Sequence, residues 1–237
     1  MRIAVFGDVH GNIFALNAVL TQIDAIKPDK VVCVGDLVGY GPFPNEVIET
    51  IRSRGIITIQ GNYDEGVGLD LMACGCDYKD QKAMEMGAAS LYWTQDNTRS
   101  ENKSWLSSLP VDYIAEWEGV TVRFTHGSPR ANNEYLFEGS EALLQVMDSI
   151  KESVLVCGHT HLPYHQMING KQIINSGSIG KPKHGNPNAT WIYAEISNGR
   201  WSVKIMETAY DAESMAKAIE ASTLPHGFAD MIRSGKG

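Results

Sequence analysis

Positive charge, cysteine and long apolar runs are all scarce in this sequence, and each scarcity excludes a class of protein. The 20 lysines and arginines face 28 aspartates and glutamates, which leaves a net charge of −8. An acidic protein binds nucleic-acid phosphates weakly, so we expect no nucleic-acid polymer as a partner. The 4 cysteines include one C-x-C, Cys74 and Cys76, without a second pair at zinc-finger spacing, so no structural zinc is expected there.

Membrane and export signals are missing as well. There is no run of about 20 apolar residues, so no transmembrane span is expected. The first residues, MRIAVFGDVH, lack the basic and long apolar regions of a signal peptide. Together with the sparse cysteines, this predicts a cytoplasmic protein without a membrane partner.

The length and apolar content indicate a globular chain. Apolar residues make up 43% of the 237 residues, which excludes a disordered protein. That length supports one well-packed core more readily than two. We therefore predict a single domain over residues 1–237.

Short apolar runs alternate with helical patterns near the start of the chain. Residues 2–6, 30–34 and 56–59 are predicted strands, and residues 13–26 and 44–55 are predicted helices. This alternation predicts βαβ units with a parallel sheet. Ligands in such folds bind beyond the carboxyl ends of the strands.

The middle of the chain differs in character from its ends. Residues 66–110 are predicted to be helical, and they form either an inserted cap over the site or a layer packed on the core. Strands are predicted at 120–126 and 153–157. The whole predicts an α/β fold with two sheets and flanking helices.

Turn and cap signals mark the last third of the chain. Asn169-Gly170 is a strong two-residue hairpin signal between two apolar runs. Ser197-Asn198-Gly199 is a second hairpin candidate. Asp211 is the expected N-cap of a helix over 212–221.

Five glycine-bearing motifs follow predicted strands, and they contain most of the metal-binding side chains of the sequence. The motifs are GDVHGN, GDLVGYG, GNYD, THGSP and GHTH, and their candidate ligands are Asp8, His10, Asp36, Asn62, His126, His159 and His161. A mixture of imidazole, carboxylate and amide oxygen suits a borderline divalent ion such as Mn, Fe, Co, Ni or Zn. Burying so many ionisable groups without cations is costly, so metal binding is favoured over chance.

Residue spacing suggests how two pairs of ligands are presented. Asp8 and His10 are two residues apart at a strand exit, and His159 and His161 share this spacing. In extended backbone such side chains point to the same side. Each pair is therefore expected to face one place.

The ordered series of five motifs resembles the calcineurin-like metallophosphoesterases over roughly residues 1–200. The resemblance is strongest to small bacterial phosphoesterases with a GSIG segment, present here at residues 177–180. It implies a four-layer αββα sandwich of two mixed sheets, with two divalent metal ions at one edge. It also implies hydrolysis of phosphoric esters or anhydrides, in which a water activated by both metals attacks phosphorus in line.

The resemblance also assigns roles to individual residues. One metal would be held by Asp8, His10 and His161, and the other by Asn62, His126 and His159. Asp36 would bridge the two ions. The implied catalytic residues are Asp36, Asn62, Tyr63 and His126.

Tyr63 departs from the family pattern, in which histidine often follows the asparagine and protonates the leaving group. A phenol has a pKa near 10 and is a poor general acid near pH 7. We therefore favour Tyr63 as a wall of the pocket over an acid. Its neighbour Asp64 is expected to orient a histidine ligand or to form a surface salt bridge.

Several residues near the motifs are candidate substrate contacts. Lys181, Lys183 and His184 follow the GSIG segment, and Arg130 follows His126. They could contact a phosphate or a nucleotide, or they could simply face solvent. Tyr40 and Phe43 could stack on a base or pack on the domain.

Two functions from different classes remain open. The first is a hydrolase of a small phosphorylated substrate, with a nucleotide as one candidate. The second is a non-catalytic metal-binding scaffold, because a retromer subunit with this fold serves chiefly as a binding surface. Retention of all seven ligands argues against the scaffold. The oligomeric state and the native metals, manganese among them, stay open.

Overall fold

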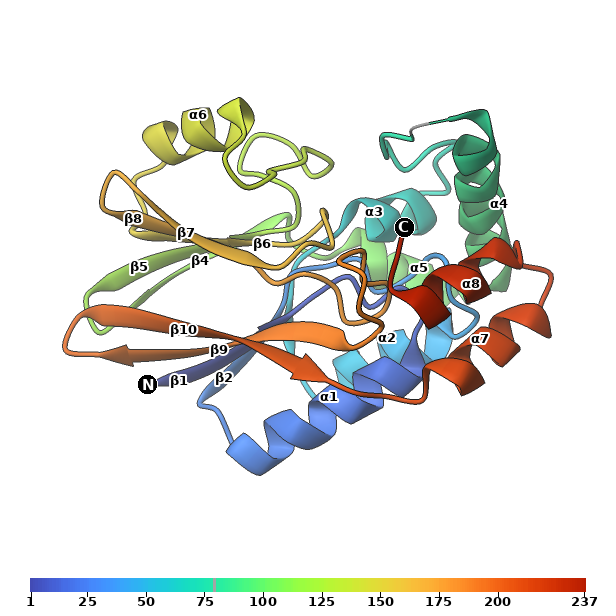
Figure 1. Cartoon of the computed structure of the whole chain (residues 1–237), viewed down its shortest axis with the longest axis horizontal. Coiled ribbons are helices and arrows are strands. Elements are labelled where there is room, and N and C mark those ends of the chain that lie inside the picture. Colours follow the sequence, from blue (N-terminus) through green and yellow to red (C-terminus); the bar gives the residue numbers. More distant parts are fainter. Residues whose placement is uncertain (79) are drawn as a thin grey trace.

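Two five-stranded sheets form the centre of the molecule, and each mixes parallel and antiparallel strands (Figure 1). The computed structural model describes residues 1–78 and 80–237. The strand order is β10-β9-β1-β2-β3 in the first sheet and β4-β5-β6-β8-β7 in the second. The strands are β1 Arg2–Phe6, β2 Lys30–Cys33, β3 Ile57–Thr58, β4 Asp112–Trp117, β5 Val120–Thr125, β6 Val154–Cys157, β7 Tyr164–Ile168, β8 Lys171–Asn175, β9 Ala189–Ser197 and β10 Arg200–Thr208.

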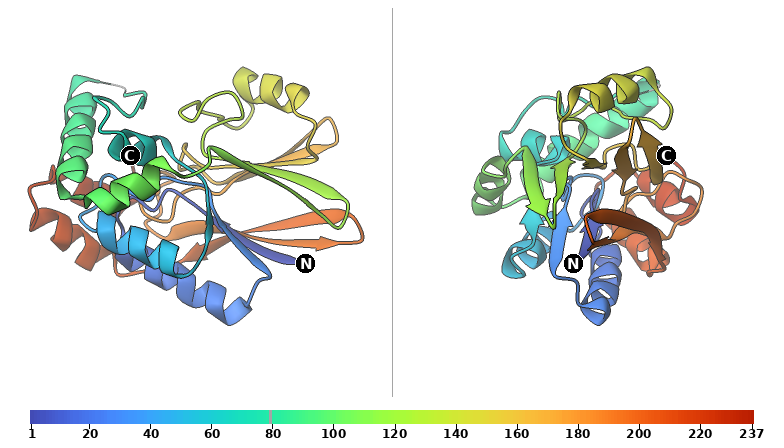
Figure 2. Two further views of the ribbon diagram at one scale, coloured as in Figure 1. Left: turned by 180° about the vertical axis from the view of Figure 1, so that it is seen from behind. Right: turned by 90° about the vertical axis from the view of Figure 1, so that its left-hand side faces the viewer.

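Helices cover the outer face of each sheet. The described residues form the helices α1 Ile13–Ile26, α2 Pro44–Ser53, α3 Asn62–Gly68, α4 Gln81–Asn97, α5 Ser100–Ser107, α6 Glu141–Ser149, α7 Ala212–Glu220 and α8 Gly227–Ser234. Helices α4 and α8 pack against other helices. Figure 2 shows the two sheets stacked, with α1 outside the first and α6 outside the second. This arrangement confirms the predicted α/β sandwich of two mixed sheets with flanking helices.

The apolar strands are buried on both faces, which explains why they lack a polar alternation. In β1, Ile3 and Val5 join the apolar cluster between the sheets. Ala4 and Phe6 point the other way, into the cluster beneath α1 and α2. A strand covered on both sides reads as a continuous apolar run, as residues 2–6 do.

Left-handed two-residue turns set the register of the hairpins. Asn169 and Gly170 have φ of 50° and 79° and join β7 to β8, as predicted. The second hairpin is shorter than predicted, because Ser197 is still paired in β9 and only Asn198 and Gly199 form the turn. Asparagine and glycine tolerate positive φ, which a right-twisted hairpin turn requires.

Three elements were not predicted from the sequence, and α3 begins at Asn62, before the helical segment predicted from residue 66. Strand β4 pairs with β5 through a turn at Glu118 and Gly119, whose φ values are 49° and 79°. Glutamate is an unusual residue for a left-handed position, so the turn carried no signal. Helices α6 and α8 were also missed.

Residues 66–110 are largely helical, as predicted. They contain the end of α3 and the whole of α4 and α5. Helix α4 packs on the C-terminal helices, where Trp93 Nε1 donates a hydrogen bond to Thr223 Oγ1 at 2.9 Å. Whether this segment acts as a cap stays a prediction, as does the single-domain assignment.

Helix starts agree with the predicted signals. Pro44 is the first residue of α2, where its missing N–H costs nothing. Asp211 caps α7, because its carboxylate accepts the backbone N–H of Ser214. Helix α2 ends at Ser53, two residues before the predicted end at Gly55.

The packing between the sheets predicts the largest loss of stability on truncation. Ile192 of β9 is fully buried in that cluster. We expect Ile192→Ala to lower the free energy of unfolding by about 2–5 kcal/mol, because a cavity replaces the side chain. Val111→Ala, at a position 63% exposed, should cost less than about 0.5 kcal/mol. Urea denaturation measures both, and equal losses would contradict this view of the core.

Candidate metal centre

The predicted metal-binding residues follow β1, β2, β3, β5 and β6. They lie in loops, except for Asn62, which is the first residue of α3. These positions are at the carboxyl ends of the parallel strands of both sheets. Because the sheets are stacked, these loops meet at one end of the sandwich (Figure 1). Residues far apart in the sequence are thereby brought together.

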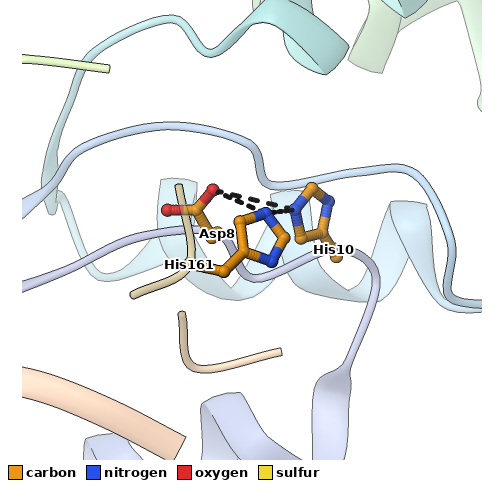
Figure 3. Close-up of side chains that lie close together, drawn as sticks. All are labelled: Asp8, His10 and His161. Atoms are coloured by element: carbon orange, nitrogen blue, oxygen red, sulfur yellow. Dashed lines mark hydrogen bonds and ion pairs between the residues drawn. The ribbon is translucent and has the colours of Figure 1, made fainter. Parts of the chain in front are cut away.

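The first group of three side chains joins the two sheets. Asp8 and His10 follow β1, and His161 follows β6. Figure 3 shows the three converging, with His161 Nε2 at 3.2 Å from Asp8 Oδ1 and 3.1 Å from His10 Nε2. Atoms that share an ion at about 2.1 Å lie about 3.0–3.5 Å apart, so this spacing fits one divalent ion.

The second group contains Asp36, His126 and His159. Asp36 Oδ2 lies 3.3 Å from His126 Nε2 and 3.7 Å from His10 Nε2. This carboxylate therefore stands between the two groups. All six side chains of the two groups are buried, and within each group the candidate ligand atoms lie within 4.8 Å of one another.

Asn62 is adjacent to the second group. Its Oδ1 lies 3.0 Å from His126 Nε2. Its Nδ2 donates to the carbonyl oxygen of Cys74 at 2.9 Å and to Cys76 Sγ at 3.2 Å. These two contacts turn the amide so that its oxygen faces the histidine.

Each of the four imidazoles donates one ring N–H to a backbone carbonyl, at 2.6 to 3.1 Å. The pairs are His10 with Val38, His126 with Val34, His159 with Asn133, and His161 with Lys181. Such a bond fixes the tautomer and leaves the other ring nitrogen with a lone pair. In the neutral rings the lone pair is on Nδ1 in His159 and on Nε2 in His10 and His161. In His126 it would be on Nε2 once a metal replaces the proton there.

One buried oxygen in the first group has no hydrogen-bond partner among the residues that the structure describes. Asp8 Oδ2 accepts the backbone N–H of His159 at 3.1 Å. Asp8 Oδ1, which faces His10 and His161, is unsatisfied. An orphaned buried carboxylate oxygen is costly, and a bound cation would satisfy it. The donor set therefore fits a divalent ion.

The histidines of the site are mostly held neutral. Burial lowers the pKa of His10 and of His159 to about 3. Burial also lowers the pKa of His161 well below its usual value. Neutral imidazole is the form that binds metals.

His126 and Asp36 form the ion pair of the metal-free cluster. Burial opposes protonation of His126, but the neighbouring Asp36 carboxylate raises its pKa to about 9. Burial likewise opposes ionisation of Asp36, yet His126 brings its pKa down to about 2. Burial raises the pKa of Asp8 to about 7. A cation would take the place of the protons that balance these carboxylates.

The pairs at i and i+2 converge for a different reason from the one predicted. Asp8 and His10 have φ of 50° and 49°, and His159 and His161 have 64° and 60°. The prediction of extended backbone is therefore wrong, because both loops turn through left-handed conformations. Backbone hydrogen bonds hold the first loop, with Asp8 N–H donating to Gly35 O at 2.9 Å. Strained backbone of this kind is often found at functional sites.

Asp64 does not orient a histidine and does not form a surface salt bridge. It is fully buried, and its two oxygens accept the backbone N–H groups of Leu37 at 2.8 Å and Gly61 at 2.9 Å. These contacts show that both predicted roles of Asp64 are wrong. Asp64 instead ties the loop after β2 to the start of α3, and burial raises its pKa to about 7.

Tyr63 is fully buried beside the first group. Its ring packs edge-on against His10, with centroids 5.7 Å apart, and lies 4.7 Å from the ring of Tyr40. Its hydroxyl meets Tyr78 Oη at 3.4 Å. Burial raises the pKa of Tyr63 well above its usual value. Its backbone N–H donates to Asp36 Oδ1 at 2.8 Å, so the main chain supports the carboxylate between the groups.

A cavity of about 790 Å³ adjoins the metal-binding groups. Tyr40 and Tyr135 line it, and their rings contact His10 at 4.8 Å and His159 at 4.0 Å between centroids. Phe43 instead packs against Phe14, with centroids 5.8 Å apart. Of the two interpretations, Tyr40 therefore faces the cavity and Phe43 packs on the domain.

The predicted substrate contacts occupy different environments. Lys181 is 6% exposed and lines the cavity, so a solvent-facing role is wrong for it. Burial lowers its pKa to about 7. Lys183 also lines the cavity. In the described part of the chain the ring nitrogens of His184 are buried without hydrogen-bond partners.

Arg130 lies at the surface and binds a neighbouring acid. Its side chain is 41% exposed, and its guanidinium pairs with the Glu134 carboxylate. It also donates to Gln145 Oε1 at 3.3 Å. No contact in residues 1–78 and 80–237 joins Arg130 to the cavity lining.

The residues that position the ligands were not found from the sequence. Asn133 orients His159 through its carbonyl oxygen. Ser178 Oγ donates to the carbonyl of Asp8 at 2.7 Å and accepts the N–H of Lys181 at 2.8 Å. These contacts use backbone groups, which every residue carries, so no side-chain pattern could reveal them. Only the GSIG segment marked the neighbourhood of Ser178.

The C-x-C pair lies beside Asn62. The sulfur atoms of Cys74 and Cys76 are 2.9 Å apart, and both are free thiols. Hydrogen bonding from Cys76 lowers the pKa of Cys74 to about 7.

No helix in residues 1–78 and 80–237 combines the length and hydropathy needed to cross a membrane.

Known proteins share both the sequence and the fold. Residues 1–199 match the calcineurin-like phosphoesterase superfamily domain. An uncharacterized protein of Methanocaldococcus jannaschii, MJ0912, is 30% identical over 99% of this chain and 98% of its own. The phosphodiesterase YfcE of Escherichia coli is 26% identical over 79% of this chain and 84% of its own. A metallophosphoesterase structure from Sphaerobacter thermophilus superposes with a TM-score of 0.80 at 27% identity and covers 99% of both chains.

The family match spans most of the sequence, and the buried histidine and aspartate groups lie within it. The chain belongs to the calcineurin-like phosphoesterase superfamily.

Proposed function

We propose that this protein hydrolyses phosphoric esters or anhydrides with two divalent metal ions. The observation that carries the proposal is the position of Asp36, whose carboxylate lies between two buried groups of histidine and aspartate. Asp8, His10 and His161 would hold one ion, and Asn62, His126 and His159 would hold the other. Two ions bound there would polarise the phosphoryl oxygens and lower the pKa of a bound water.

The protein itself holds the ligands in fixed orientations and provides a wall that excludes water. Backbone carbonyls fix the four imidazoles, so little reorganisation is needed when metal and substrate bind. Tyr63 fills the space beside His10 and excludes water there. The identity of the metals, manganese included, and the cytoplasmic location remain predictions.

The proposal has a direct test in a panel of phosphate compounds. Protein loaded with Mn²⁺ should hydrolyse 4-nitrophenyl phosphate, and Asp36→Asn should lower kcat by at least about 100-fold, because the shared ligand loses its charge. Asp24→Asn is the matched control, since that carboxylate is exposed and pairs with Arg54 at the surface. Metal-loaded protein that hydrolyses no mono- or diester, dinucleotide polyphosphate or pyrophosphate would favour a binding scaffold instead.

Tyr63 is expected to act as a wall and not as an acid. Its hydroxyl is buried and meets Tyr78 Oη at 3.4 Å, and its ring packs against Tyr40. We expect Tyr63→Phe to change kcat by less than about threefold on both an aryl and an alkyl phosphate, whereas loss of a general acid costs about 10²–10⁴-fold. Steady-state kinetics decide between the two, and a loss of about 100-fold confined to the alkyl ester would show that the wall interpretation is wrong.

Gly61 leaves room for the Asp36 carboxylate. A Cβ at this position would lie 2.1 Å from Asp36 Oδ1. We expect Gly61→Ala to displace the carboxylate and weaken Mn²⁺ binding by about 10–100-fold in a calorimetric titration.

Gly119→Ala serves as the control for this substitution. It strains a left-handed turn with φ of 79° but meets no atom within 4 Å, so it should cost about 1 kcal/mol of stability and leave Mn²⁺ binding intact. Equal Mn²⁺ affinity in Gly61→Ala and wild type would contradict the crowding argument.

A further inference from the structure

Lys181 is a buried amine that faces the cavity. Only 6% of its surface is exposed, and its ammonium lies 4.8 Å from the centre of the Tyr40 ring. Within residues 1–78 and 80–237, no carboxylate oxygen lies within 4.0 Å of this ammonium. Burying an ammonium is costly unless an opposite charge offsets it. An anionic group in the cavity would do so.

The ring of Tyr40 lies between the ammonium of Lys181 and the metal-binding groups. Tyr40, whose ring lies beneath it, makes an edge contact with His10 at 4.8 Å between centroids. The backbone of Lys181 is part of the same structure, because its carbonyl accepts the Nδ1–H of His161 at 2.6 Å. A substrate that contacts both the metal-binding groups and Lys181 needs a second anionic group, in addition to the phosphoryl group at the metals.

An aromatic pair forms another wall of the cavity. The rings of Tyr135 and Phe137 stack with centroids 5.6 Å apart and planes 8° from parallel. Tyr135 reaches the metal centre through its contact with His159, and Phe137 is 47% exposed. A flat, exposed aromatic surface is suited to stacking on a planar ring such as a nucleobase.

The size and charge of the cavity agree with a ligand larger than a simple phosphate. About 790 Å³ is within the range of small-molecule sites. Asp77, Asp80 and Asp230 also line the cavity. Asp80 is turned to cap α4, and the side chain of Asp230 is 86% exposed. Lys181 is therefore the buried charge of the cavity wall.

We propose that the substrate is a phosphoanhydride bearing an aromatic group, such as a nucleoside di- or polyphosphate. Lys181 binds the phosphoryl group next to the one at the metals, and the Tyr135 and Phe137 rings stack on the aromatic group. This inference rests on the proposed hydrolase function and narrows it to one class of substrate.

The chemistry of an anhydride matches the residues present. Water adds its oxygen to the phosphorus at the metals, the P–O bond to the bridging oxygen breaks, and its electron pair stays on the leaving phosphate. The protons of the water pass to the phosphate products or to solvent. A phosphate is a good leaving group and needs little help from an acid, which fits a buried tyrosine at position 63. Lys181 offsets the charge that develops on the leaving phosphate.

Three substrates separate the parts of this proposal in the Mn²⁺-loaded full chain. They are 4-nitrophenyl phosphate, with one phosphoryl group; inorganic pyrophosphate, with two; and adenosine diphosphate, with two and an aromatic base. We expect Lys181→Met to lower kcat/KM by about 10–100-fold on pyrophosphate and adenosine diphosphate, the loss of one charged hydrogen bond. On 4-nitrophenyl phosphate the loss should stay below about threefold. Lys181→Arg should recover most of the difference.

The aromatic wall has its own prediction in the same assay. Phe137→Ala should lower kcat/KM by about 10-fold on adenosine diphosphate and leave pyrophosphate unchanged, because only the former can stack. Lys217→Met and Leu144→Ala are the controls. Both residues are exposed, on α7 and α6 respectively, and neither should alter any of the three rates.

The outcomes separate this inference from the hydrolase proposal. Equal effects of Lys181→Met on all three substrates, or no effect on any, would overturn the inference while hydrolysis itself stands. The same holds if wild type hydrolyses 4-nitrophenyl phosphate but neither anhydride. A wild-type protein inert on all three would overturn this inference. If it is also inert on the phosphodiesters and dinucleotide polyphosphates of the wider panel, the hydrolase proposal falls as well. Thermal melting of each variant shows that a lost activity is not a lost fold.

Discussion

The Asp36 carboxylate, held between two buried groups of ligands, is the interaction on which the site depends. One of its oxygens accepts the backbone N–H of Tyr63, and the other faces His126 and His10. Gly61 passes so close that no side chain fits there. The carboxylate is therefore fixed by the backbone at the start of α3, and the metal-binding groups on either side are brought into contact through it.

Burial has a cost that the surrounding backbone partly offsets. The neutral imidazoles of His10, His159 and His161 avoid the cost of buried charge, and each satisfies one ring nitrogen through a carbonyl oxygen. The left-handed residues at Asp8 and His159 add strain. Two stacked sheets tolerate this strain because their apolar interior is rigid and lies away from the site. The fold thus stabilises a cluster that is unfavourable by itself.

Much of this arrangement could be predicted from the sequence, because strand ends and glycine-bearing motifs are local signals. Strand β1 was predicted correctly from its apolar run. The turn at Asn169-Gly170 was predicted correctly because asparagine and glycine tolerate the positive φ that it requires. The turn at Glu118 uses a residue that rarely adopts positive φ, and it was missed with its strand. Local signals of this kind depend on neighbours in the chain, not on neighbours in space.

The roles of Asp64 and Lys181 depended on packing that no motif records. Asp64 binds backbone N–H groups of Leu37 and Gly61, which any sequence could provide. From the sequence, Lys181 was expected in a solvated basic loop. Tertiary packing instead buries it in the wall of the cavity. Such residues acquire their environment only when distant segments meet, so the sequence gives the chemistry of the side chain and not its surroundings.

A crystal structure of the protein soaked in Mn²⁺, with anomalous difference maps, tests the central claim most directly. The account predicts two peaks, one beside Asp8, His10 and His161 and the other beside Asn62, His126 and His159, with Asp36 oxygens about 2.0–2.3 Å from both ions. A single peak, or two peaks of which one does not touch Asp36, would contradict it.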